Sequence, residues 1–178
     1  MQIPQQCKLF VGLLTNEVFL FDEIKQELNE IFGQIDLEGP VWPWQHTDYY
    51  LKDMGDDLKR KFLFFKNLIR PEDISRIKIN TMDIEQRFLR KDGGRRVNID
   101  PGYIDFARVV LVSSKDFSHR LYLGHGIYAE VALSFVKKGY QPLPYTYPDF
   151  RSAEYIELFG RARELYSAQI KRGQSAQA

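Results

Sequence analysis

The chain has 178 residues, of which 44% are hydrophobic and 28% charged, a composition typical of soluble globular proteins and unlike that of disordered or fibrous chains. Its 25 basic and 24 acidic residues give a formal net charge of +1, so no overall field attracts nucleic acid or an acidic membrane. Cys7 is the only cysteine, which excludes an internal disulfide and any metal site built from several cysteines. Its apolar neighbours predict a buried, unreactive thiol.

The length of the chain fits one compact domain. We expect a single domain over residues 1–178, with a core at about 7–100, a β extension at about 103–143, a C-terminal helix at about 152–171 and a frayed tail at 173–178. The first residues lack a basic region followed by an apolar stretch, and no segment approaches the ~20 apolar residues that span a bilayer. These features predict a cytoplasmic protein without a membrane partner.

Hydrophobic periodicity defines the first elements. Residues 8–14 are apolar in both alternating sets, which predicts a central strand covered on both faces. A helix is predicted next, because apolar residues recur at helical spacing up to the stop signal Gly33; they are Phe21, Ile24, Leu28, Ile31 and Phe32. Residues 34–44 fit an edge strand, since Pro40 and Pro43 cannot donate ladder hydrogen bonds. The loop that follows either closes over a ligand or packs on the protein, and it contains His46, Asp48, Tyr49 and Tyr50.

A strand at 59–69 and a helix at 70–91 complete most of the predicted core. Pro71 suits the first turn of that helix, whose inner stripe consists of Ile74, Ile77, Thr81, Ile84 and Phe88. Residues 96–99 alternate as a strand, and the pair Pro101–Gly102 predicts a turn after it. The order strand, helix, strand, strand, helix, strand is the split pattern of ferredoxin-like folds. The predicted class is α+β, a ferredoxin-like β-α-β-β-α-β core extended by a C-terminal β-hairpin region and a final helix.

The hairpin is predicted within Ser118–Val131. A loop at 124–126 collects the apolar side chains on one face of it. The resulting pairs are Leu121 with Ala129 and Leu123 with Ile127 on that face, and Tyr122 with Tyr128 and Arg120 with Glu130 on the other. The same register places His119 on the face opposite Glu130. An exposed Arg–Glu pair is worth at most about 1 kcal/mol, so a solvated hairpin face explains this pattern as well as a binding site does.

Polar side chains gather on the strand before Pro101. Arg96, Asn98 and Asp100 share one face, an arrangement that is costly unless they have partners or line a cleft. Asn98 is suited to orient a substrate, and Asp100 to act as a general base or to hold a divalent cation. The alternative is structural, because Asp before Pro-Gly commonly initiates a turn.

Other cationic candidates lie on both sides of this strand. The basic run at 87–96 could bind phosphate, although such a run is typical of a solvated helix end. Lys115 and His119 follow the end of a strand, where ligands often bind, and His125 lies at the glycine-flanked hairpin tip. A metal site from His119, His125 and Glu130 is disfavoured by the predicted register, and no complete phosphate-loop or catalytic motif is present.

Several strings together resemble one known family. They are "KLFVGLL", "IDLEGP" with "TDYYLKDMG", "RRVNIDPGYI", "FSHRLYLGHGIYAEV" and "YTYPDFRSAEYIE". They are similar to the bacterial family catalogued as domain of unknown function 4416, and the resemblance runs from about Lys8 to the last helix. It implies a bacterial, cytoplasmic, single-domain protein and carries over no activity or catalytic residue. It disfavours a catalytic role for His125 and favours Arg120 and Glu130.

The first functional hypothesis is a polar cleft for a phosphorylated or otherwise anionic small molecule such as a nucleotide, with hydrolase or transferase activity as an extension. The candidate catalytic residues are Asp100 and Glu130, and the candidate ligand-binding residues are Arg96, Asn98, Lys115, His119, Arg120, Tyr122 and His125. The alternative is a non-enzymatic scaffold or protein-binding module in which the same residues form ion pairs. Net charge disfavours nucleic-acid binding. The sequence does not identify a cofactor, and a divalent cation is one possibility. It does not decide whether the protein forms a homo-oligomer.

Overall fold

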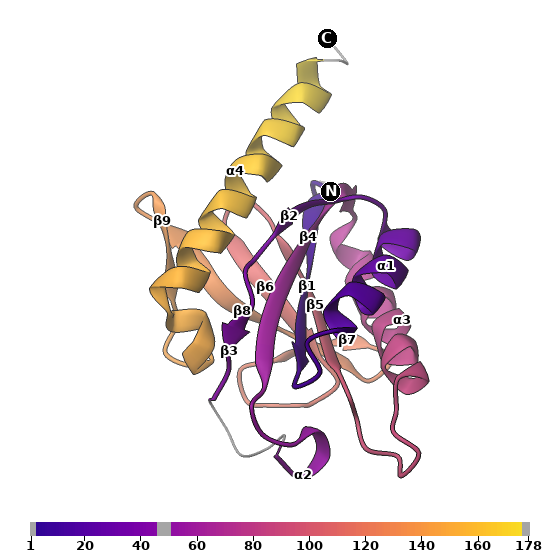
Figure 1. Ribbon diagram of the computed structural model, residues 1–178. Helices are drawn as coiled ribbons and strands as arrows, with labels where there is room; N and C mark the ends of the chain where they lie inside the picture. The colour runs from indigo at the N-terminus through magenta and orange to yellow at the C-terminus, as the bar shows by residue number, and fades with distance from the viewer. Residues whose placement is uncertain (1–2, 46–50, 176–178) are drawn as a thin grey trace.

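The computed structural model describes residues 3–45 and 51–175 (Figure 1). The strands are β1 (Cys7–Thr15), β2 (Ile35–Glu38), β3 (Trp42–Pro43), β4 (Lys59–Ile69), β5 (Asn98–Ile104), β6 (Arg108–Ser113), β7 (Leu121–Gly124), β8 (Ile127–Val136) and β9 (Gly139–Pro142). The helices are α1 (Leu20–Phe32), α2 (Leu51–Met54), α3 (Ile74–Arg87) and α4 (Ala153–Ser175), with 3₁₀ turns η2 (Pro71–Asp73) and η3 (Pro148–Arg151). The candidate loop with His46, Asp48, Tyr49 and Tyr50 lies outside the described residues.

The strands of the described residues form one antiparallel sheet of nine strands. Its main path is β2-β4-β1-β5-β6-β8-β7, with β3 paired to β4 and β9 paired to β8. The edge position expected for residues 34–44 is confirmed, because β2 ends the path and β3 pairs only with β4. The mixed α and β content predicted from the sequence is also confirmed, in a sheet larger than a four-stranded core.

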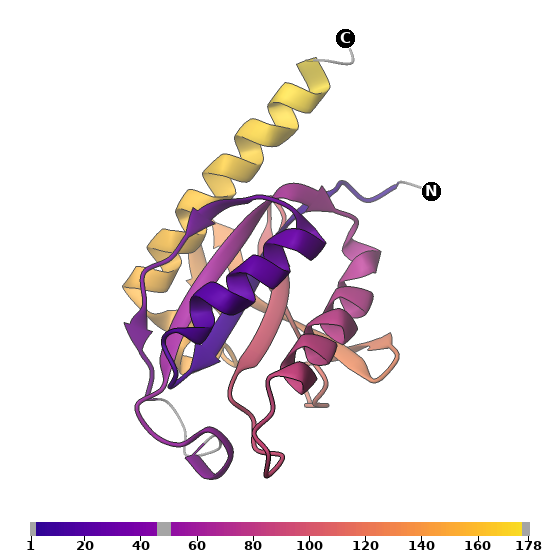
Figure 2. The same ribbon diagram turned by 45° about the vertical axis from the view of Figure 1, so that its right-hand side comes forward.

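Helices cover both faces of the sheet. Helices α1 and α3 lie on one face and α4 lies on the other (Figures 1 and 2). Leu9 and Val11 of β1 pack in the core under α1 and α3, whereas Phe10 packs with Phe159 of α4. Strand β1 is therefore buried on both sides, as its doubly apolar sequence predicts. In α1 the predicted stripe is buried except at its end, where Ile31 is 48% exposed.

The turn predicted at Pro101–Gly102 is wrong, because β5 continues through both residues. The ladder between β5 and β6 begins only at Gly102, so proline, which lacks an N–H, leaves no ladder bond unmade at Pro101. Just before it, side chains of α3 replace β6 as partners of Ile99. Lys78 Nζ donates to the Ile99 carbonyl at 2.7 Å, and the Ile99 N–H donates to Glu85 Oε1 at 2.6 Å. Strands β5 and β6 therefore separate ahead of Gly102.

The hairpin β7–β8 differs from its prediction at the tip. The pairs Leu121 with Ala129 and Tyr122 with Tyr128 are confirmed, but Gly124 pairs with Ile127 after an irregularity in the ladder. His125 and Gly126 both have positive φ, 56° and 74°, which is the conformation of a two-residue hairpin turn, so the expected three-residue loop is wrong. The expected apolar face is buried only on its β8 side, where Ile127 is 2% exposed, whereas on β7 Leu121 is 74% and Leu123 42% exposed.

Helix α4 is longer than the sequence suggested. It begins at Ala153, packs on the sheet through Tyr155 and Phe159, and continues to Ser175. Its last turns extend past the edge of the sheet (Figure 1). Within the described part of the chain, no helix has the length and apolar character needed to cross a membrane.

Candidate ligand-binding site

A cavity of about 400 Å³ lies on the α4 side of the sheet, where β5 and β6 separate. Its floor comes from neighbouring strands, and its walls come from the β6–β7 loop and the segment before α4. The lining residues are Gly12, Trp44, Arg60, Phe62, Asp100, Leu111, Val112, Ser113, Lys115, Asp116, Phe117, Arg120, Glu130, Tyr147, Asp149 and Phe150. The strand carrying Asp100 and the hairpin carrying Arg120 and Glu130 therefore meet in one concave site.

Arg60 of β4 is the central cation of the cavity floor. Its side chain is 7% exposed, with Nη1 3.6 Å from Asp100 Oδ2 and Nη2 3.7 Å from Asp149 Oδ2. The guanidinium carbon also lies 5.6 Å from the Trp44 ring centre. Gly12 makes room for this arrangement, because a Cβ there would approach Arg60 Nη1 to 3.3 Å. Two carboxylates and an aromatic ring thus fix Arg60 in place.

Asp100 is contacted by Lys78 of α3 on the side away from Arg60. Lys78 Nζ lies 3.4 Å from Asp100 Oδ1, and the Asn98 amide donates a hydrogen bond to Asp100 Oδ2. Burial acts to raise the pKa of Asp100, but the charges of Lys78 and Arg60 and the bonds from Lys78 and Asn98 outweigh it and lower the pKa below its ordinary value. Asp100 therefore stays an anion that pairs with Arg60.

Glu85 ends this row of alternating charges on the α3 side. Its Oε1 lies 3.8 Å from Lys78 Nζ. Burial raises the pKa of Glu85 above its ordinary value, against the opposing charge of Lys78 and the hydrogen bond from the Ile99 N–H. Because buried charges are costly unless they are paired, Lys78 lies between two acidic partners, Glu85 and Asp100.

Glu130 of β8 organises the other end of the cavity. Its side chain is 6% exposed, and Oε2 accepts a hydrogen bond from Arg120 Nε at 2.7 Å and lies 2.9 Å from His119 Nε2. The prediction that His119 faces away from Glu130 is therefore wrong. Strand alternation does not apply at His119, because β7 starts at Leu121 and a turn closed by the Arg120 N–H and the Phe117 carbonyl precedes it.

The proline-rich segment Leu143–Phe150, which precedes α4, forms a wall of the cavity. It folds back through a turn at Leu143–Thr146 and then η3. Thr146 is buried, with its hydroxyl donating to the Ala132 carbonyl at 2.6 Å and accepting from the Leu143 N–H at 2.7 Å. The wall is tied to β8 at this point.

Two aromatic contacts fix the ends of the wall. Tyr145 stacks on His119 with ring centres 4.3 Å apart, and Tyr147 lies parallel to Trp44 at 6.4 Å. Asp149 accepts a hydrogen bond from Trp44 Nε1 at 2.9 Å and another from the Phe150 N–H at 2.8 Å. The wall therefore runs from the Glu130 end of the cavity to the Arg60 end.

Several predicted site residues lie outside the cavity lining. Arg96 pairs with Glu17 and borders a separate shallow depression beside Arg90 and Lys91. Asn98 is buried and contacts Asp100 from behind. Tyr122 is 62% exposed, and His125 is exposed at the hairpin tip. The structure brings together only Asp100, Lys115, Arg120 and Glu130 as lining residues, with His119 behind Glu130.

The sequence reasoning missed Arg60, Trp44, Tyr147 and Asp149. For Arg60 a signal was present, because it alternates with Phe62 and Phe64 and so had to lie on a buried apolar face. For Tyr147 and Asp149 the signal was absent, since their positions depend on how the wall folds back, and the position of Trp44 depends on its packing with Leu14, Met54 and Leu58. Among the described residues, no group of three or more His, Cys, Asp or Glu side chains is arranged to hold a metal ion.

The fold and the cavity define a protein of mixed α and β structure, in which a large antiparallel sheet carries a charged and aromatic cavity of ligand size. The model of the family described as "Domain of unknown function (DUF4416)" matches residues 5–166, so the chain belongs to this family. No curated protein and no solved structure matches the chain.

Proposed function

We propose that the cavity binds a small anionic molecule, for which a phosphorylated compound such as a nucleotide is one candidate. The observation that carries the proposal is the meeting of Arg60 from β4 with Lys115 and Arg120 from the β6–β7 loop in one cavity of about 400 Å³. Ligand pockets generally combine a few convergent polar groups with apolar and aromatic walls at this size.

The two ends of the cavity serve different roles in this proposal. Arg60 is fixed between carboxylates and supplies a positive floor. Lys115 and Arg120 belong to the loop side, where the Arg120 guanidinium is oriented by Glu130 and by the Lys115 carbonyl at 2.9 Å. Such preorganised donors bind an anion without reordering on binding.

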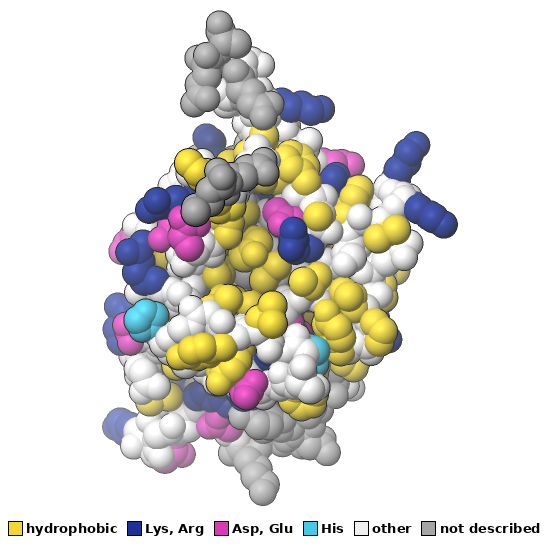
Figure 3. All heavy atoms as spheres, turned by 180° about the vertical axis from the view of Figure 1, so that it is seen from behind, with side chains coloured by type: hydrophobic (Ala, Val, Ile, Leu, Met, Phe, Trp, Pro, Cys, Tyr) yellow, Lys and Arg dark blue, Asp and Glu magenta, His cyan; other side chains and the backbone are white. Residues whose placement is uncertain are grey.

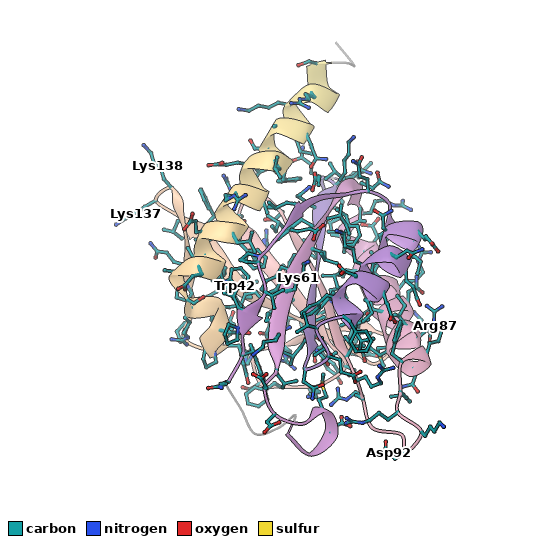
Figure 4. The ribbon with its side chains drawn as sticks, viewed as in Figure 1. Trp42, Lys61, Arg87, Asp92, Lys137 and Lys138 are labelled. Carbon is teal, nitrogen blue, oxygen red and sulfur yellow. The ribbon has the colours of Figure 1, made fainter. Side chains whose placement is uncertain are left out.

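Lys115→Ala tests the proposal against Lys138→Ala. Lys138 is exposed on the β8–β9 turn and points away from the molecule (Figure 4). Calorimetry with inorganic phosphate, adenosine monophosphate and phenylpropionate should find at least one ligand. Loss of Lys115 should weaken its binding on the order of tenfold, the value of one charge-assisted hydrogen bond. The Lys138 variant should bind as the wild type does. Equal effects of the two substitutions would contradict the proposal.

Hydrolase or transferase chemistry extends the proposal to Glu130. Asp100 is a poor proton acceptor, because its lowered pKa reflects stabilisation of the charged form by Lys78 and Arg60. Glu130 has one carboxylate oxygen, Oε1, that accepts no hydrogen bond from the described residues. We therefore propose Glu130 as the general base and Asp100 as the residue that positions Arg60.

A protein-binding role is the second candidate function. Exposed apolar side chains on and beside β7 favour it, since Leu121 is 74%, Tyr122 62% and Phe117 62% exposed. This candidate predicts that no small anion changes the melting temperature. Nucleic-acid binding has less support, because positive and negative side chains are interspersed on the face shown in Figure 3.

We also propose that the first half of the chain is a ferredoxin-like unit within a single domain. The order β2-β4-β1-β5, with every neighbouring pair antiparallel and with α1 and α3 on one face, supports this. The remaining strands then extend the unit and create the separation at which the cavity lies.

A further inference from the structure

The charges around the cavity favour a ligand that carries a cationic group in addition to its anionic group. Among the described residues that line it, three are cationic and four are acidic. Arg60 is shared by two carboxylates, and Arg120 is bonded to Glu130. A ligand whose only charge is negative contacts the cations but leaves the acidic side chains without a counter-charge. A ligand that also carries a positive group can pair with both.

The second observation is that both hydrogen-bond contacts of Glu130 use the same carboxylate oxygen. This side chain is 6% exposed, and both of its hydrogen-bond contacts, from Arg120 and His119, are made at Oε2. No described residue donates to Oε1, and this oxygen is not among the fully buried unpartnered atoms of the described residues. Glu130 lines the cavity, so Oε1 is open to a donor from the ligand or from water.

Arg120 has a complementary feature, a donor nitrogen without an acceptor among the described residues. Its Nε donates to Glu130 and its Nη1 donates to the Lys115 carbonyl, whereas Nη2 has no partner among the described residues. An acceptor oxygen of Glu130 and a donor nitrogen of Arg120 therefore lie on neighbouring groups. Together they suit an ammonium group and an anionic group carried by one small molecule.

The mouth of the cavity accounts for the rest of such a molecule. Phe117 from the loop side is 62% exposed and Tyr147 from the wall is 38% exposed, and both rings line the cavity. These partly exposed rings can pack against an apolar or aromatic substituent whose charged end lies deeper.

From these contacts we infer that the ligand is a zwitterion: a protonated amine faces Glu130, an anionic group faces Arg120 and Lys115, and an apolar body lies between Phe117 and Tyr147. This inference rests on the proposed anion-binding function. The anionic group is either a carboxylate, as in an amino acid, or a phosphate, as in a phosphorylated amine.

Matched ligands test the inference on the unmodified protein. Calorimetry compares L-phenylalanine with phenylpropionate, which lacks the amine, and with phenethylamine, which lacks the carboxylate. A second arm compares phosphoethanolamine with ethyl phosphate. We expect the zwitterion of at least one arm to bind roughly tenfold more tightly than its amine-free partner, as a charged hydrogen bond would give. The arm that shows this difference identifies the anionic group.

The outcomes separate the two proposals. If phenylpropionate or ethyl phosphate binds as tightly as its zwitterionic partner, anion binding stands and the zwitterion inference is overturned. If no compound of either arm binds and the phosphate and nucleotide ligands fail too, both proposals are overturned.

Glu130→Gln provides a second readout, the ratio of the two affinities within one arm. This ratio should fall toward one in Glu130→Gln, because the neutral amide no longer favours an ammonium group. It should stay unchanged in Glu154→Gln, a matched substitution on the exposed start of α4. An unchanged ratio in Glu130→Gln would overturn the inference even if the amine-bearing ligands bind. Should Glu130→Gln fail to fold, the ligand comparison on the wild-type protein decides alone.

Discussion

Asp100 shows how single contacts decide what a residue at this site can do. Its position on a polar strand face was evident from alternation, but its partners Lys78 and Arg60 come from α3 and β4. These cations and the Asn98 amide hold the pKa of Asp100 below its ordinary value despite burial. A group whose pKa is lowered on folding contributes stability above its unfolded pKa and loses it as pH falls through its folded pKa.

The free energy of unfolding should therefore fall as pH drops below 3.8, the ordinary value for this side chain. In Asp100→Asn that part of the pH dependence should be missing. Glu85 does not obscure this effect, because folding raises its pKa above 4.5. The stability that Glu85 contributes is therefore lost as pH rises through that higher pKa, not as pH falls below 3.8. Urea unfolding at a series of pH values measures the effect.

Asp92→Asn is the matched control for that experiment. Asp92 lies at the tip of the loop after α3 (Figure 4), with a side chain that is 77% exposed. The control should retain the slope of the wild type. If Asp100→Asn also retains it, the ion pairs assigned to Asp100 do not contribute to stability.

At the scale of elements, the wall Leu143–Phe150 is the feature on which the cavity depends. The Thr146 hydroxyl bonds it to β8, through the Ala132 carbonyl. Thr146→Val removes the hydroxyl at nearly constant volume and leaves the Ala132 carbonyl and the Leu143 N–H unpaired. We expect a loss of about 1–3 kcal/mol in the free energy of unfolding, the cost of unmade buried hydrogen bonds.

Thr146→Ser keeps the hydroxyl and should lose much less stability. The valine variant should also bind the cavity ligand more weakly, because Tyr147 and Asp149 follow directly after the loosened residue. Urea unfolding and calorimetry on the same preparations check both effects. Equal stability of the Val and Ser variants would show that the hydroxyl does not hold the wall.

Most elements of the fold could be predicted from the sequence, and the failures share one physical cause. Strands β1 and β4 and helices α1 and α3 carry their own periodic signals, so local pattern was sufficient for them. The turn assigned to Pro101–Gly102 failed because Lys78 and Glu85, distant in sequence, take over the hydrogen bonds of Ile99. His119 was misplaced because the strand begins two residues later than alternation implied.

At the scale of the whole molecule, the cavity exists because the sheet continues through β6, β8 and β7 beyond its first four strands, β2-β4-β1-β5. Strands β1, β4 and β5 bring Gly12, Arg60 and Asp100, and β8 brings Glu130 across the separation between β5 and β6. Helix α4 covers the same face, and the segment that leads into α4 closes the site. Sequence pattern identified Asp100 and Glu130 but could not reveal that they share a cavity, since strand order is a long-range property.

The central claim is that this cavity is the binding site of the protein. It is tested most directly by amide NMR spectra of the labelled protein during titration with L-phenylalanine and, separately, adenosine monophosphate. The account predicts that at least one of them shifts a set of signals confined to Gly12, the loop Ser113–Arg120, Glu130 and the wall Leu143–Phe150. Shifts confined to the basic turn around Arg90 and Arg96, or no shifts with either compound, would contradict it.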